Sequence, residues 1–357
     1  MTLSDVARYR FSNQLIARQT ARTPAEVVAW LGAMQAQDFL GAKWSVGLRA
    51  PGVTDAMVEQ ALADRTIVRT WPMRGTLHFV SPDDVRWMLS LLAARVLAAS
   101  KGRWQQLGLN DKIFAQSRKV FRQALRGGKQ LTRNEMYQAL ERAKTSTAGQ
   151  RGYHLLWRNA QEGLICLGPP RGKQQTFVLL DEWVLPAKPL ERDEALAKLV
   201  LRYFTGHGPA TVRDFVWWSG LTAKDAQAGI EMSVSQLASE VIDGKTYWMA
   251  RRMSALPAHP PVVALLPGFD EYILGYTARD PIVDPRHARK IYSGLNLLFN
   301  PTVAIDGRIQ GTWKRLIRKE TVDLSLHPFK KLNRAEAHAL RRATQRYGEF
   351  LGLRVAS

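Results

Sequence analysis

The residues with the clearest chemical potential lie in one short segment, residues 34–44, which combines two glutamines, a carboxylate and two aromatic rings. Gln35, Gln37 and Asp38 follow an apolar stretch with helical spacing. Side chains two residues apart do not face each other on a helix, so the two glutamines converge only where the chain leaves helical geometry. Gly41 permits such a departure. The segment therefore predicts either a polar pocket with aromatic walls or an exposed helix end with ordinary polar residues.

Basic residues are concentrated in two blocks of the sequence. Residues 101–160 hold 13 Lys and Arg against 3 Asp and Glu, and residues 286–357 hold 15 against 5. Of the 51 basic and 31 acidic residues in total, 23 of each sign lie elsewhere, so these blocks carry the whole surplus of 20 positive charges. Segregated positive charge predicts a polyanionic partner, nucleic acid or an anionic membrane surface, although two basic solvated helix faces would look the same.

The composition excludes several classes of protein. An apolar fraction of 46% with 11 Trp, 12 Phe and 9 Tyr excludes a disordered chain. The single cysteine, Cys166, allows no intramolecular disulfide and no Cys-based metal site, and the seven histidines are scattered, so we expect neither a metal nor a cofactor. The most apolar stretch, residues 87–99, is too short to span a bilayer. We expect a cytoplasmic, nucleoid-associated monomer without membrane contact.

Capping residues, among them Thr23, Thr132 and Thr211, and hydrophobic spacing predict helices followed by a strand pair, three times along the chain. The first set has helices at 3–19, 24–34 and 54–62 and strands at 66–70 and 76–80. The second has helices at 112–125, 132–142 and 149–162 and strands at 164–167 and 175–180. The third has helices at 191–204, 211–218 and 222–230 and a hairpin at 237–250 with Asp243-Gly244 as its turn. This order is typical of winged-helix units.

The chain beyond residue 255 has a different character. A stiff proline-rich connector at 256–261 precedes an apolar strand at 262–266, a hairpin at 297–314 with Asp306-Gly307 as its turn, a strand at 321–326 and a helix at 334–351. The fold class we predict is α+β and mainly helical: three tandem winged-helix units and a small C-terminal β-containing domain. The boundaries we predict are 1–100, 101–187, 188–255 and 256–357.

Winged helices most often bind duplex DNA through a recognition helix in the major groove. In the second unit this helix spans residues 149–162, and its polar side chains are Arg151, His154, Arg158, Asn159 and Gln161. Arginine and the side-chain amides read guanine and adenine edges. On these features alone, the protein is a DNA-binding module, and a non-catalytic transcriptional regulator is one reading of it.

Four stretches of the chain resemble the AlkZ/YcaQ family of winged-helix DNA glycosylases. The first is the helix followed by Met-Gln-Ala-Gln-Asp at 34–38 and Gly-Ala-Lys-Trp-Ser-Val-Gly-Leu-Arg at 41–49. The others are Arg69–His78, Leu266–Tyr276, and the pair Asp306–Arg308 and Gly311–Trp313. Together they extend over nearly the whole chain, and the ordered set is more specific than any one motif.

The resemblance implies a fold, an activity and a site. The family has three tandem winged helices arranged as a C around DNA, with a C-terminal β domain. It removes bulky N7-alkylguanines from double-stranded DNA, and some members unhook interstrand crosslinks, in DNA repair or genotoxin self-resistance. Its signature of Gln, an apolar residue and then Gln or Asp maps onto Gln35, Ala36 and Gln37. The Gln-x-Gln form resembles the AlkZ-like branch.

The chemistry suits such a site. An N7-alkylated guanine is cationic, so its glycosidic bond is already weakened and the enzyme has mainly to position water. A glutamine carbonyl accepts a hydrogen bond from water while its amide donates elsewhere. We expect Gln37 to orient the water and Gln35 to hold the sugar or the water, with Asp38 either the base or a backbone cap. Because no lysine is required, we expect a monofunctional enzyme; Lys43 is the residue that would overturn this.

Further residues are candidates for holding DNA. They are Lys43, Arg69, Arg74, His78, Arg151, Arg158, Arg308, Gln310 and Lys314. For His78, the interpretation as a core or turn histidine is favoured slightly over phosphate binding, because Leu77 and Phe79 flank it. The Asp306-Gly307 turn is a candidate for insertion into the minor groove, with Arg308 and Gln310 making the contacts. Asp270 and Glu271 look like a catalytic acid pair, but we interpret them mainly as internal ion-pair partners of the basic C-terminal block.

Overall fold

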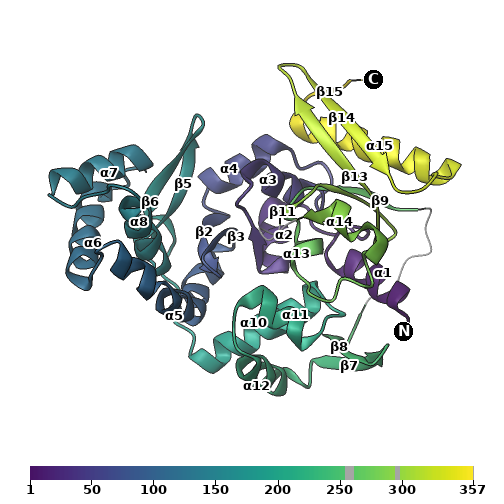
Figure 1. The fold of residues 1–357 in the computed structure, drawn as a ribbon, viewed down its shortest axis with the longest axis horizontal. Helices are drawn as coiled ribbons and strands as arrows, with labels where there is room; N and C mark the ends of the chain where they lie inside the picture. The colour runs from purple at the N-terminus through teal and green to yellow at the C-terminus, as the bar shows by residue number, and fades with distance from the viewer. Residues whose placement is uncertain (254–260, 294–297, 357) are drawn as a thin grey trace. The chain divides into compact units, whose positions relative to one another are not determined.

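The computed structural model describes residues 1–253, 261–293 and 298–356. Its contacts divide the chain into two units: residues 1–58 with 196–357 form unit 1, and residues 59–195 form unit 2. Figure 1 labels the helices and strands along the chain. Among the described residues, no helix is both long enough and apolar enough to cross a membrane. The expectation of a mixed, mainly helical chain is confirmed.

Unit 1 begins with three short helices and continues after unit 2. Its first elements are α1 (Leu3–Asn13), α2 (Pro24–Leu31), β1 (Ala33–Gln35) and α3 (Phe39–Gly47). The chain returns through α10 (Arg192–Gly206), α11 (Val212–Ser219), α12 (Ala223–Ser233), β7 (Leu237–Ile242) and β8 (Lys245–Ala250). Val6 of α1 packs with Tyr247 and Met249 of β8, so the N-terminal helix is fixed to this hairpin.

The C-terminal part of unit 1 is built on a five-stranded sheet in the order β15-β14-β13-β12-β9. The strands are β9 (Val263–Leu266), β12 (Thr302–Ile305), β13 (Arg308–Ile317), β14 (Thr321–Pro328) and β15 (Arg354–Val355). The connecting elements are α13 (Glu271–Leu274), a 3-10 turn at Pro285–His287, α14 (Ala288–Ile291), β10 (Tyr292–Ser293) and β11 (Leu298–Phe299). The helix α15 (Arg334–Leu351) lies along this sheet (Figure 1).

Aromatic rings join α3 to the C-terminal sheet and α15. The Trp44 ring lies 4.9 Å from Tyr347 and 5.1 Å from Phe350, measured between ring centroids, and Trp313 lies 5.1 Å from Tyr347. The indole N–H of Trp44 donates to the Leu265 carbonyl, at 2.6 Å. Burying such large rings is strongly stabilising, and the polar N–H is satisfied at the same time. The helix α3 is therefore fixed to the C-terminal sheet and to α15.

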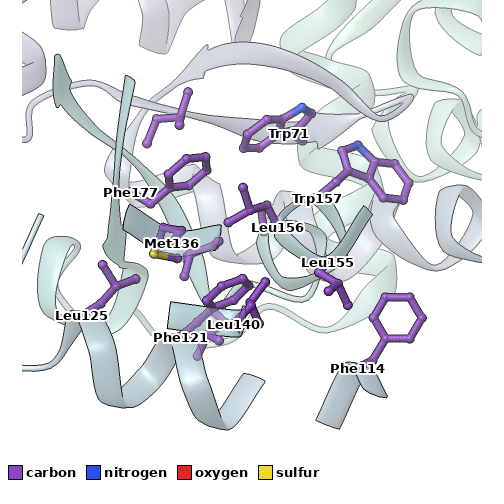
Figure 2. Packing of buried hydrophobic residues seen from close by; sticks show 14 of the residues in the cluster. Trp71, Phe114, Phe121, Leu125, Met136, Leu140, Leu155, Leu156, Trp157 and Phe177 are labelled. Atoms are coloured by element: carbon purple, nitrogen blue, oxygen red, sulfur yellow. The ribbon is translucent and has the colours of Figure 1, made fainter. Parts of the chain in front are cut away.

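Unit 2 contains the second group of helices and hairpins. Its elements are most of α4 (Asp55–Ala63), β2 (Val68–Met73), β3 (Thr76–Val80), α5 (Pro82–Gln106), α6 (Asp111–Leu125), β4 (Leu131–Thr132), α7 (Arg133–Arg142), α8 (Arg151–Gln161), β5 (Ile165–Arg171), β6 (Gln174–Leu179) and α9 (Leu180–Trp183). Its strands pair in the order β3-β2-β5-β6-β4. Figure 2 shows the core, where Phe121 and Leu125 of α6 and Met136 of α7 pack with Trp157 of α8 and Phe177 of β6.

Three local expectations need correction. The first helix ends at Asn13 rather than near residue 19, and Leu15 follows with a left-handed φ of 61° that no helix continues. The strand pair expected at 164–180 is longer on its turn side, with β5 reaching Arg171. The 25-residue helix α5 was not expected, and it runs through residue 100, where the first boundary was placed.

Candidate active site

Residues 34–44, which carry Gln35 and Gln37 and are called the glutamine segment below, do not continue the helix before them. The helix α2 stops at Leu31, and Gly32 follows with φ of 80°, a conformation that favours glycine. The chain then forms the short strand β1, and α3 begins at Phe39. Gln35 therefore ends a strand and Gln37 lies in the bend before α3. The expected departure from helical geometry exists, but Gly32 makes it; Gly41 lies inside the first turn of α3.

Asp38 is the N-cap of α3 and also faces a cation. Its Oδ1 accepts from the Gly41 amide at 3.2 Å, and its Oδ2 lies 3.6 Å from Nη2 of Arg315. Arg315 also donates to the Tyr347 hydroxyl at 3.0 Å, and burial raises the pKa of that phenol, which therefore stays neutral. Both oxygens of Asp38 thus have structural partners. The side chain is 40% exposed, so it remains accessible to a reactant.

The backbone of Gln35 is held by a buried carboxylate. The Gln35 N–H donates to Oε1 of Glu271 at 2.9 Å. Glu271 begins α13 and is 1% exposed, while its Oε2 accepts from the indole N–H of Trp218 at 3.0 Å and lies 3.4 Å from Nε2 of His207. Gln35 is half-buried and Gln37 is exposed. The segment thus presents an exposed glutamine, Gln37, two residues after Gln35, whose backbone amide is fixed.

Asp270 anchors the other side of the segment. Its carboxylate accepts two hydrogen bonds from Arg49, at 2.8 and 2.9 Å, and one from the Ser45 hydroxyl at 2.5 Å. Its Oδ1 also accepts from the Tyr272 amide and caps α13. The structural interpretation of the acid pair is confirmed for these contacts. The expected partners were wrong, because Asp270 and Glu271 contact α3, β1 and α11 rather than the basic C-terminal block.

Lys43 lies in α3 with its side chain 5% exposed. Its ammonium group donates to Oδ2 of Asp55 at 2.6 Å and lies 4.9 Å from the centroid of the Phe39 ring. A buried ion pair of this kind fixes the ammonium group in place. The structure therefore gives Lys43 a role inside unit 1, and its contact with DNA stays a prediction.

Three of the residues expected to hold DNA lie on β13, where side chains alternate between exposed and buried positions, as in a strand with one buried face. Arg308 and Gln310 are half-exposed and Lys314 is exposed, whereas Trp313 is buried and donates to the Leu266 carbonyl, which confirms its place in the core. The Asp306-Gly307 turn has left-handed φ values of 48° and 88°, as a type I′ turn requires.

That turn does not project from the protein. The Gly307 carbonyl accepts from the Tyr272 hydroxyl at 2.6 Å, and a Cβ at Gly307 would lie 2.6 Å from the Ala7 carbonyl oxygen. Asp306 in addition accepts from the Val262 amide at 2.9 Å. The turn is therefore packed against α1 and α13 through Gly307, while Asp306 is exposed, and its insertion into a DNA groove stays a prediction.

The other expected DNA contacts lie in unit 2. Arg69 pairs with Phe79 across β2 and β3, Arg74 is at the tight turn between these strands with φ of 51°, and Nδ1 of His78 lies 2.9 Å from the Thr76 carbonyl. Arg151 of α8 donates to the Ser146 and Leu107 carbonyls. Arg69 is 5% exposed and His78 is 0% exposed, and this burial favours the interpretation of His78 as a core histidine. Contact of Arg69, Arg74, His78 and Arg151 with DNA stays a prediction.

The face of α8 that was expected to read DNA bases is buried in the core of unit 2. Asn159 and Gln161 are each 1% exposed, and Asn159 donates to the Ser117 hydroxyl at 2.9 Å. Arg158 pairs with Glu162 at 2.7 Å and with Asp111 at 3.1 Å. Buried amides do not reach base edges, so the assignment of Asn159 and Gln161 to base readout is wrong.

Comparison with known proteins shows which protein family the chain resembles in sequence and fold. A solved structure, Streptomyces sahachiroi DNA glycosylase AlkZ, has the same fold: the TM-score is 0.83 at 24% identity, covering 100% of this chain and 99% of that one. A relative from the same organism, named interstrand DNA cross-link repair glycosylase, is 28% identical over 362 residues, which is 94% of this chain and 95% of the relative. Residues 28–350 match the family described as DNA glycosylase AlkZ-like.

The chain belongs to the AlkZ-like DNA glycosylase family. It is a DNA repair glycosylase, a hydrolase that acts on N-glycosyl bonds in DNA. The resemblance read from the four sequence stretches is confirmed, and the alternative of a non-catalytic regulator is not supported.

Proposed function

We propose that this glycosylase hydrolyses the N-glycosidic bond of bulky N7-alkylguanines, including those in interstrand crosslinks, and that Gln35 and Gln37 carry the reaction. The observation that supports this is the break between α2 and α3, where Gln37 is exposed two residues after Gln35, whose backbone amide is held by Glu271. The name of the Streptomyces relative supports crosslinks as substrates.

The reaction depends more on positioning the attacking water than on acid catalysis. An N7-alkylated guanine leaves as a neutral base, so no proton has to reach it, and water must attack the anomeric carbon as the sugar gains oxocarbenium character. The Gln37 carbonyl accepts from that water and orients it, and the Gln35 amide group holds the sugar or the water from the other side. Asp38, with 40% of its side chain exposed, either takes the proton from the water or positions the segment.

We further propose the domain architecture given by the family resemblance. Three winged-helix units at 1–100, 101–187 and 188–255 and a C-terminal domain at 256–357 curve around DNA as a C. The order of helices and hairpins in the structure supports these units. The protein acts as a monomer on the nucleoid in the cytoplasm, without a metal or a cofactor.

Duplex DNA is held by the two basic blocks. The segment at 1–100, which carries the glutamine pair, has 11 basic and 8 acidic residues, so its net charge is only +3. A weakly basic surface there does not repel a cationic base. We propose that phosphate contacts come from Lys43, Arg69, Arg74, His78, Arg151, Arg158, Arg308, Gln310 and Lys314. Because each phosphate contact releases counterions, binding weakens steeply with salt and depends little on sequence.

The test is a panel of duplexes that carry N7-methylguanine or a nitrogen-mustard crosslink, treated under single-turnover conditions with the wild type, Gln35→Ala and Gln37→Ala. We expect the wild type to release the base and leave an abasic site. Gln37→Ala should abolish release while the Kd for DNA changes little. Gln236→Ala, which removes an exposed glutamine before β7, is the matched control and should behave as the wild type.

Two results would overturn the proposal. If Gln37→Ala releases N7-methylguanine at the wild-type rate, the segment is not the active site. If the wild type acts on neither duplex, the substrate class is wrong. Activity on the monoadduct without activity on the crosslink would remove crosslinks from the proposal and leave the rest.

A further inference from the structure

Glu271 is a buried carboxylate that contacts the glutamine segment through the backbone. It is 1% exposed, yet each of its two oxygens accepts a different N–H: Oε1 from the Gln35 amide at 2.9 Å and Oε2 from the indole of Trp218 at 3.0 Å. The imidazole of His207 lies beside it, with Nε2 3.4 Å from Oε2. Removing a carboxylate from water is costly, so a buried one needs such partners.

The chemistry of the side chain explains why a carboxylate occupies this position. The Gln35 amide and the Trp218 indole are both donors, and only a group with an acceptor at each end satisfies these two together. Glutamine has the same shape, but it places an NH₂ group against one of the two donors. An unsatisfied buried donor is expensive, so the pair of contacts requires an acid here.

The residue before Glu271 contacts residues just beyond the other end of the same segment. Asp270 accepts from Ser45 and Arg49 on the far side of α3, at 2.5 and 2.8 Å, while Glu271 binds the last residue of β1. Pro267, three residues earlier, lies against the first turn of α3, 3.3 Å from a Cβ built at Gly41. The stretch 267–271 thus contacts the glutamine segment on both sides.

We propose that Glu271 is a positioning residue for catalysis, because its contact with the Gln35 amide fixes the backbone from which Gln35 and Gln37 project. The inference rests on the proposed function of those glutamines. Glu271 does not touch the reacting atoms. It acts through one hydrogen bond, and a displacement of the glutamines by about 1 Å is enough to slow a reaction that depends on placing water by about 100-fold.

The test isolates that hydrogen bond by working in a Trp218→Phe background, which removes the competing indole donor. In W218F/E271Q, the amide nitrogen can take the place that faced the indole, and its carbonyl can accept from Gln35. In W218F/E271M, neither position holds an acceptor. The two variants differ in whether the side chain at position 271 can accept from the Gln35 amide. Both lack the carboxylate charge and the indole.

We measure single-turnover release of N7-methylguanine, the Kd for the same duplex, and amide hydrogen exchange of the peptide that contains Gln35. We expect W218F and W218F/E271Q to retain the wild-type rate and protection. W218F/E271M should lose the exchange protection of the Gln35 amide and release the base roughly 10- to 100-fold more slowly, with an unchanged Kd. A purely structural role would change stability and Kd instead of this rate.

Two outcomes overturn the inference. One is a wild-type rate in W218F/E271M. The other is a loss of rate in W218F/E271Q, which would assign the effect to the charge; this variant can overturn the inference even when the methionine variant does not fold. Gln37→Ala is assayed alongside. If it is inactive while W218F/E271M is active, the proposed active site stands and only the role of Glu271 fails; if both are active, the proposed active site fails too.

Discussion

Arg49 and Asp270 form a two-point ion pair in which neither side chain is exposed. Nη1 of Arg49 lies 2.9 Å from Oδ2 of Asp270, and Nη2 lies 2.8 Å from Oδ1. The remaining donors of Arg49 bond to oxygens of Ser45 and Gln14, so the whole guanidinium is satisfied. This pair joins the end of α3 to the start of α13, and it therefore ties the glutamine segment to the C-terminal part of unit 1.

Breaking the pair from one side should destabilise the protein strongly. Asp270→Asn keeps the shape but leaves the Arg49 charge buried without a counter-charge, which costs about 3–5 kcal/mol. The free energy of unfolding from urea titration measures this loss. Lys245→Gln is the control, because it breaks an exposed pair with Asp280 (2.7 Å) and should cost at most about 1 kcal/mol. Equal losses of unfolding free energy in Asp270→Asn and Lys245→Gln would show that burial does not determine how much such a pair stabilises the protein.

Asp214 should contribute to the loss of stability in acid. Burial opposes ionisation of this carboxyl, but the Arg10 guanidinium and hydrogen bonds from Ala278, Thr211 and Thr277 prevail, and its pKa lies below 3.8. A lowered folded-state pKa gives a stabilisation that is complete above the unfolded-state value and is lost as the pH falls through the folded-state value.

The variant Asp214→Asn removes this titration. We expect it to be less stable than the wild type at pH 7 and to have a shallower fall of unfolding free energy from about pH 5 to about pH 3. Urea titrations across that interval measure the slope. An unchanged slope in the variant would assign the acid sensitivity to other carboxyl groups.

The sequence predicted the features that local chemistry determines. The caps Thr23, Thr132 and Thr211 are found where they were expected, because a side-chain oxygen at a helix start satisfies nearby amides regardless of the rest of the fold. The Asp243-Gly244 hairpin turn is also confirmed, since its left-handed φ values restrict the residues allowed there.

The contacts of the candidate site could not be predicted in the same way. Glu271 meets Gln35 across 236 residues of sequence, and no spacing or periodicity encodes such a pairing. The break in the helix was expected at Gly41 rather than Gly32, because either glycine permits it and the choice depends on Asp38 capping α3. Long α5 was missed because its apolar positions were judged as a membrane candidate instead of a helix face.

The two readings of Asp38 predict different variants. As a cap, Asp38 should be replaced well by Asn, which also accepts from the Gly41 amide, whereas Ala should cost about 0.5–2 kcal/mol of stability. Because both carboxylate oxygens have structural partners, we expect Asp38→Asn to release N7-methylguanine at a rate close to the wild type. A loss of about 10²–10⁴-fold in a folded Asp38→Asn protein would instead identify a general base.

Lys43 should not form a covalent intermediate with DNA. A lysine attacks the sugar only through an amine lone pair, and the Lys43 ammonium donates to Asp55 at 2.6 Å with its side chain almost fully buried. We therefore expect borohydride to trap no protein–DNA adduct and the product strand to break only after alkali treatment. Lys43→Met should leave the rate of base release unchanged per folded molecule and lower stability, because Asp55 loses its partner. An adduct that forms with the wild type and disappears in Lys43→Met would show that the enzyme is bifunctional.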